Sequence, residues 1–146
     1  MSTNVIDILL VEDNTADVEL ALRALKKNNI LNPIHVVHDG AKALEFLFAQ
    51  GEYSNRKDFK SPKVVLLDLK LPKVNGLEVL KQVKSDERTK MIPVVILTTS
   101  REEQDIIESY KLGVNSYIVK PVDFDDFARA VTEIGCYWVL MNKPPY

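Results

Sequence analysis

The sequence predicts a doubly wound α/β domain, in which helices cover both faces of a five-stranded parallel sheet. Short apolar segments rich in β-branched residues alternate with longer amphipathic segments, in five strand–helix pairs. The apolar segments are nearly continuous, which is typical of parallel strands buried on both faces. Right-handed crossovers between such strands place helices on both sides of the sheet.

The expected strands are the apolar segments 5–11, 33–38, 64–67, 94–97 and 116–119. Segment 33–38 alternates more than the others, so we expect it nearer an edge of the sheet. The expected helices cover 17–27, 41–50, 77–84 and 102–112, and a last helix begins after Asp123. Asp123 is a suitable N-cap, and Gly113 is a suitable C-cap for the helix before it. The polar stretch 51–62 is either a solvated loop or a partner contact.

The length of 146 residues suits one domain, which we expect over 1–141 with an extended last helix, followed by a short tail at 142–146. The net charge of −2 implies no general affinity for nucleic acid. No apolar run is long enough to span a membrane, and we expect no secretory signal at the N-terminus. Cys136 is the one cysteine, which excludes an internal disulfide and fits a reduced, cytoplasmic location.

Polar residues follow four of the expected strands, at the edge where such sheets form their sites. The first strand ends in Glu12 and Asp13, the third in Asp68, the fourth in Thr98 and the fifth in Lys120. Each of these residues alone has a structural explanation, such as a helix cap, a strand-end hydroxyl or a solvated charge. Their joint placement at successive strand ends predicts one site.

Three carboxylates that meet repel each other unless a cation neutralises them, and a small set of oxygen ligands favours Mg²⁺. A carboxylate beside Mg²⁺ can attack a phosphoryl donor and become an aspartyl phosphate. A hydroxyl and a lysine ammonium could bind the oxygens of that phosphoryl group. These residues therefore favour a switch that is controlled by phosphorylation.

Two other function classes remain as alternatives. A phosphohydrolase that uses an aspartyl phosphate usually needs a second acid near the nucleophile, but Leu69 and Lys70 follow Asp68. In a nucleotide-binding module, the acidic loop after the first strand would repel phosphate. We interpret His35 and His38, in the second strand and away from the acidic edge, as structural or surface residues. Cys136 is interpreted as a packed thiol.

Four stretches carry the motifs of a known family: ILLVEDN at 8–14, LDLKLP at 67–72 with Asn75 and Gly76, PVVILTT at 93–99, and YIVKP at 117–121. They span nearly the whole chain in the family's order. The chain resembles a response-regulator receiver domain of two-component signalling. It is most similar to the stand-alone regulators of cyanobacterial phytochromes, which also share QGEY at 50–53 and an aromatic C-terminal extension. The resemblance implies the flavodoxin-like receiver fold.

The resemblance also implies roles for particular residues. Asp68 is the expected phosphoacceptor, and Asp13 and Asp68 are expected to bind Mg²⁺ with the backbone carbonyl of Lys70. Glu12 is expected to bind the ion directly or through water, although many receivers have Asp at this position.

Thr98 and Lys120 are expected to bind the phosphoryl oxygens. Tyr117 occupies the aromatic switch position, whose rotation is coupled to Thr98. The bond between Lys120 and Pro121 is expected to be cis. Thr99 stands where smaller residues are common, and it would narrow access to the phosphoacceptor.

The expected phosphodonor is a sensor histidine kinase, with a bacterial phytochrome as the favoured candidate. The protein would then be no enzyme beyond its own phosphotransfer and dephosphorylation. The sequence leaves no room for a DNA-binding output domain after residue 141, so we expect the output to be a contact with protein or passage of the phosphoryl group.

The apolar residues at the end of the last helix predict that the protein forms a homodimer. Its apolar stripe consists of Phe124, Phe127, Ala128, Val131, Ile134 and Trp138. The sequence CYWVLM at 136–141 has no polar face, and in a continued helix Tyr137 and Leu140 lie off the stripe. Such an end needs a second buried surface, which a second copy of the chain could supply. The alternative is that these residues fold back on their own monomer.

Overall fold

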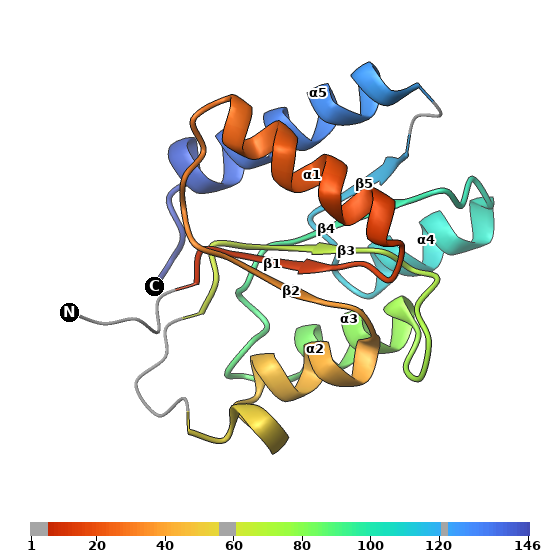
Figure 1. The fold of residues 1–146 in the computed structure, drawn as a ribbon. Coiled ribbons are helices and arrows are strands. Elements are labelled where there is room, and N and C mark those ends of the chain that lie inside the picture. The colour runs from red at the N-terminus through yellow and green to blue at the C-terminus, as the bar shows by residue number, and fades with distance from the viewer. Residues whose placement is uncertain (1–5, 56–60, 121–122) are drawn as a thin grey trace.

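The structure is a computed structural model, and it describes residues 6–55, 61–120 and 123–146 (Figure 1). Five parallel strands form one sheet in the order β2-β1-β3-β4-β5. Their bounds are β1 (Ile8–Val11), β2 (Ile34–Val37), β3 (Val64–Leu67), β4 (Val94–Thr98) and β5 (Ser116–Val119). The predicted fold class is confirmed, and so is the position of the second strand at an edge.

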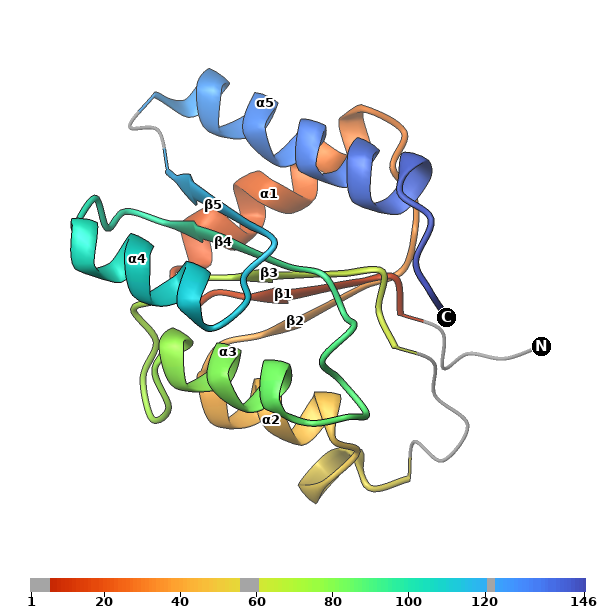
Figure 2. The ribbon, with the colours of Figure 1, turned by 180° about the vertical axis from the view of Figure 1, so that it is seen from behind.

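Within the part of the chain that the structure describes, five α-helices cover the two faces of the sheet: α1 (Thr15–Lys27), α2 (Gly40–Leu47), α3 (Gly76–Ser85), α4 (Glu103–Lys111) and α5 (Phe124–Gly135). The α1 and α5 helices lie on one face, and α2 and α3 lie on the other with α4 beside α3 (Figures 1 and 2). Alternate residues of β1 supply the two cores: Leu9 and Val11 pack toward α2 and α3, whereas Ile8 and Leu10 pack toward α1 and α5. The strand is continuously apolar because both faces are buried.

Local capping explains where several helices begin and end. The α1 helix begins at Thr15, two residues earlier than predicted, because the side chain of its N-cap Asn14 accepts a hydrogen bond from the Asp17 N–H at 3.1 Å. The predicted N-cap Asp123 is confirmed. The C-cap of α4 is Leu112, and the predicted Gly113 follows it with φ +98°, the left-handed conformation that ends the helix. The second helix ends at Leu47 rather than residue 50, and a 3₁₀ turn follows at Gly51–Tyr53. Residues 56–60 of the predicted loop lie outside the described residues.

The end of the last helix differs from a regular α-helix. A π-helix, η2 (Cys136–Met141), continues α5, and the Asn142 N–H donates to the Tyr137 carbonyl at 2.6 Å. The wider turn brings Val139 into the core, where it is 4% exposed, while the predicted stripe residue Trp138 is half-buried beside it. The periodicity of a regular helix could not predict this change. The side chain of Phe124 lies outside the described residues.

The C-terminal residues lie at the end of the sheet where the strands begin (Figure 1). The Tyr146 hydroxyl donates to the Pro62 carbonyl at 2.7 Å, and Lys63 Nζ donates to the Val139 carbonyl at 3.4 Å. The tail is therefore attached to the segment that enters β3. Among the described residues, no helix has the length and apolar character to cross a membrane.

Candidate functional site

Three carboxylates meet at the carboxyl ends of β1 and β3. The two strands end level, since Val11 is paired with Leu67, and Glu12 and Asp68 therefore follow them side by side. Glu12 is 4% exposed and Asp68 is 7% exposed, whereas Asp13 lies on the surface. One carboxylate oxygen from each of the three acids lies within 4.8 Å of the other two. The structure thus brings together the acids that the sequence analysis placed in one site.

The backbone after Asp68 is held by short-range contacts. Asp68 Oδ1 accepts a hydrogen bond from the Lys70 N–H at 3.2 Å, and the Gly76 N–H donates to the Leu69 carbonyl at 2.9 Å. A Cβ atom at Gly76 would lie 2.4 Å from the Asp68 carbonyl oxygen. Glycine is therefore required where α3 begins against the Asp68 backbone.

Lys120 reaches the acids from the end of β5. Its side chain is 6% exposed, and its ammonium donates to Asp68 Oδ2 at 3.1 Å, to Asp17 Oδ2 at 2.9 Å and to Glu12 Oε1. Three carboxylates thus match the three N–H groups of the ammonium. Asp17 is a site residue that the strand-end pattern did not predict. The available signal was an acid in the first turn of the helix that follows β1.

The charges around Lys120 determine which acid is ionised. Burial raises the pKa of Glu12 to about 7, although Lys120 partly opposes this shift. Burial alone would also raise the pKa of Asp68, but the Lys120 ammonium and hydrogen bonds from the Thr98 side chain and the Lys70 N–H outweigh it and hold that pKa below its usual range. Burial opposes the charge of Lys120, but hydrogen bonds to Glu12 and Asp17 hold its pKa above its usual range. At neutral pH, Asp68 is therefore an ionised carboxylate paired with a charged lysine.

A short chain of contacts leads from Asp68 to α4 and β5. Thr98 is fully buried at the end of β4, and its Oγ1 accepts a hydrogen bond from the Ser100 N–H at 3.4 Å. The Tyr117 hydroxyl donates to the Ser100 carbonyl at 3.1 Å, and Ser100 Oγ donates to Asp105 Oδ2 at 2.6 Å. Ser100 is thus the contact shared by the end of β4, β5 and the beginning of α4.

Both histidines and Cys136 lie in or beside the hydrophobic cores or the acidic site. His38 was predicted away from the acidic edge, and this is wrong: β2 ends level with β1, and a ring nitrogen of His38 lies 3.1 Å from the Glu12 backbone carbonyl. His35 stacks on Phe46 with ring centroids 4.6 Å apart. Cys136 is half-buried and packs against the core beneath α1 and α5. The expected cis bond before Pro121 lies outside the described residues.

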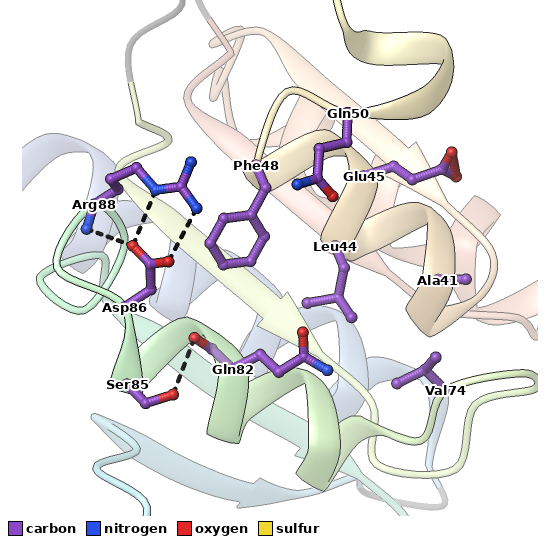
Figure 3. Close-up of a pocket in the computed structure, with 10 residues that line it drawn as sticks. All are labelled: Ala41, Leu44, Glu45, Phe48, Gln50, Val74, Gln82, Ser85, Asp86 and Arg88. Atoms are coloured by element: carbon purple, nitrogen blue, oxygen red, sulfur yellow. Dashed lines mark hydrogen bonds and ion pairs between the residues drawn. The ribbon is translucent and has the colours of Figure 1, made fainter.

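A separate groove of about 490 Å³ lies between α2 and α3 (Figure 3). At one end, the Arg88 guanidinium lies 5.0 Å from the centre of the Phe48 ring. The same guanidinium donates to both carboxylate oxygens of Asp86, at 3.1 and 3.0 Å. The residues that line this groove are distinct from the acids at the ends of β1 and β3.

Residues 8–132 match the sequence model of the response regulator receiver domain. The chain belongs to this family. The receiver domain is 46% identical over 138 residues to the probable methanogenesis regulatory protein FilR2 of Methanothrix harundinacea, a match that covers 94% of this chain and 86% of FilR2. It is 44% identical over 132 residues to the response regulator Rcp1 of Synechocystis, which covers 90% of this chain and 88% of Rcp1.

Solved structures agree with the fold of this receiver domain. The phosphorylated cyanobacterial phytochrome response regulator RcpA superposes with a TM-score of 0.88 at 40% identity, covering 99% of this chain and all of that one (100%). The Mn²⁺-bound form of Rcp1 also has a TM-score of 0.88, at 42% identity, and covers 98% of this chain and 99% of that one. The receiver domain is thus a response regulator related to phytochrome regulators, and its acidic cluster has the donors of a divalent-metal site.

Proposed function

We propose that this receiver domain accepts a phosphoryl group on Asp68 from a sensor histidine kinase and thereby switches a protein-interaction surface. The observation that carries the proposal is the state of Asp68. It is a buried, ionised carboxylate, 3.1 Å from the Lys120 ammonium, and the Thr98 side chain helps to lower its pKa. A carboxylate in this state is a nucleophile with two groups beside it that can bind phosphoryl oxygens.

The transfer is a displacement at phosphorus. An oxygen of Asp68 forms the new bond to phosphorus, and the bond from phosphorus to the phosphohistidine nitrogen of the kinase breaks. The electron pair of that bond remains on the imidazole. Lys120 and Thr98 bind the oxygens of the transferred group, which carry more negative charge than the free carboxylate did.

The acidic cluster fits a divalent cation, which we propose to be Mg²⁺. Its donors are hard carboxylate oxygens, and Lys120 supplies one positive charge against several negative ones. Glu12, Asp13 and Asp68 would hold the ion together with the backbone carbonyl of Lys70. When bound, Mg²⁺ offsets the negative charge that would otherwise repel an anionic phosphodonor. We assign the protein no catalytic activity beyond its own phosphotransfer and dephosphorylation.

The relatives support a phytochrome as the kinase partner. RcpA is described as a phytochrome response regulator, and it aligns with this chain over almost its full length. FilR2 is described as a regulator of methanogenesis, so phosphotransfer profiling against several purified kinases is the direct test of the partner. We place this exchange in the cytoplasm and assign no role to nucleic acid or membrane.

The exposed apolar side chains of η2 support a second copy of the chain as another partner. Tyr137, Leu140 and Met141 are 49%, 62% and 74% exposed, whereas Val139 packs on its own monomer. Folding back therefore accounts for only part of the apolar end. A two-fold axis beside η2 would cover the exposed side chains with the same residues of a second copy.

Replacing the phosphoacceptor tests the central proposal. Asp68→Asn keeps the size of the side chain but removes the nucleophilic carboxylate, so labelling by a small phosphodonor with Mg²⁺ should be lost. Mass spectrometry of the intact protein measures the added phosphoryl group. Asp86→Asn is a suitable control, because Asp86 pairs with Arg88 beside the separate groove. Undiminished labelling of Asp68→Asn would falsify the assignment.

A further inference from the structure

Asp17 lies outside the predicted site, yet its carboxylate contacts the site lysine. Asp17 Oδ2 accepts a hydrogen bond from the Lys120 ammonium at 2.9 Å, across 103 positions of sequence. The side chains of Asp17 and Lys120 are 26% and 6% exposed. Solvent and salt screen such a partly buried ion pair less than a pair on the surface.

The start of α1 leaves the Asp17 carboxylate available for this contact. In a capping box, an acid at this position of the helix turns back to accept the N–H of the cap residue. Here the Asn14 N–H donates to Glu12 Oε2 instead, at 3.2 Å. Asp17 still donates its own N–H to the Asn14 side chain, so the helix is capped without its carboxylate.

The three carboxylate partners of Lys120 are not equivalent. Glu12 and Asp68 belong to the cluster that can hold a metal ion, whereas Asp17 does not. A divalent cation in that cluster competes with the ammonium for Glu12 and Asp68. Asp17 is the partner for which the ion does not compete.

We propose that Asp17 is a positioning residue for phosphoryl acceptance: it holds the Lys120 ammonium where that group can bind the phosphoryl oxygens. The inference rests on the proposed role of Asp68. Without Asp17, the flexible side chain of Lys120 samples more conformations, and a smaller fraction of them places the ammonium where it can bind the transferred group. A group that is less well oriented stabilises the transition state less.

Two measurements test the inference. One is the initial rate of phosphorylation by acetyl phosphate at saturating Mg²⁺, which removes any effect on metal affinity. The other is the exchange of the Lys120 ammonium protons with water, observed by NMR at saturating Mg²⁺, where the ion competes for Glu12 and Asp68. In both Asp17→Ala and Asp17→Asn, we expect the rate to fall about three- to tenfold. We also expect the ammonium protons to exchange faster, and Asp17→Glu to recover part of both properties.

A matched control separates this effect from stabilisation of the helix. Glu78 occupies the same position in α3 as Asp17 does in α1, after an Asn75 cap with the same hydrogen bond, at 3.0 Å. Its carboxylate accepts from Gln82 at 3.1 Å and plays no part in the acidic cluster. Glu78→Ala loses a comparable acid at a helix N-terminus, and we expect both measurements to match wild type.

Either of two results would overturn the inference: phosphorylation of the Asp17 variants at the wild-type rate, or unchanged exchange of the Lys120 ammonium protons. A wild type that acetyl phosphate does not label would instead contradict the proposed function. The exchange measurement, made without phosphodonor, then still decides whether Asp17 holds Lys120.

Discussion

Thr98 lies between Asp68, whose pKa it helps to lower, and Ser100, whose N–H donates to it and whose carbonyl accepts from the Tyr117 hydroxyl. Thr98 is therefore the residue to alter when testing the switch. Thr98→Ala keeps the Asp68 nucleophile, so phosphorylation should still occur. The structural response should be weaker, because a phosphoryl group can shift an equilibrium only through contacts that differ between the two conformations. NMR shifts of Tyr117 on phosphorylation measure the response.

Thr132→Ala is the control for that experiment, because Thr132 lies on α5 away from the acids and its hydroxyl donates to the Ala128 carbonyl of the same helix. If Tyr117 responds as strongly in Thr98→Ala as in wild type, Thr98 is not the coupling residue.

Asp13 is the exposed member of the acidic cluster, and its removal should chiefly weaken metal binding. Asp13→Ala removes one ligand and one negative charge but leaves Asp68 in place. We expect Mg²⁺ affinity to fall by about tenfold, equivalent to about 1.4 kcal/mol. Isothermal calorimetry measures it, with Glu19→Ala on α1 as a control for net charge. Equal affinities of Asp13→Ala and wild type would remove Asp13 from the site.

The third helix is attached to the sheet through Lys84. Its ammonium donates to the carbonyls of Lys90 and Ile92 at 3.1 and 2.7 Å, and to Asn115 Oδ1 at 3.0 Å. Burial lowers the pKa of Lys84 to about 8 from its ordinary value of 10.5. Between these values the unfolded chain binds more protons than the folded one, so Lys84 makes the free energy of unfolding rise with pH.

Urea unfolding at pH 8 and pH 10 measures this contribution. Relative to Lys84→Met, the wild type should gain stability over that interval, by at most about 2 kcal/mol, because solvent screens the charge of this partly exposed group. Lys81→Met, an exposed lysine of the same helix, should show no such difference from wild type. A stability difference between wild type and Lys84→Met that is constant with pH would contradict the expectation.

The elements that the sequence predicted well are those whose pattern is local. The strands are apolar on both faces, and Gly113 and Asp123 mark helix ends with their own side chains or backbone conformations. Asp17 was missed because its partner Lys120 lies 103 residues away, just after the last strand. His38 was misplaced because its position depends on the register of two strands, which apolar patterning does not specify.

The exposed apolar side chains of η2 predict that two chains associate. Leu140→Glu places a charge on a side chain that is 62% exposed, so it should not disturb the monomer. In a dimer the same charge would be buried beside its own copy, and association should be lost. Sedimentation velocity, with and without phosphorylation, compares the mass with 16.6 kDa for one chain.

Met91→Glu is the matched control for association, since Met91 is 58% exposed on the segment between α3 and β4. It should sediment as wild type does. The homodimer proposal fails if wild type remains monomeric at micromolar concentration in both states.

Trp138 is the one tryptophan of the chain, and it lies in η2 with its ring edge-on to Tyr137, centroids 5.0 Å apart. All tryptophan fluorescence therefore originates at the end of the sheet remote from the carboxylates. Light emitted there does not report the arrival of an ion directly, as it would from an indole beside the phosphoacceptor. A change in emission on phosphorylation would instead show that the conformational change reaches the opposite end of the strands. The intrinsic fluorescence of Trp138 detects it without an attached dye.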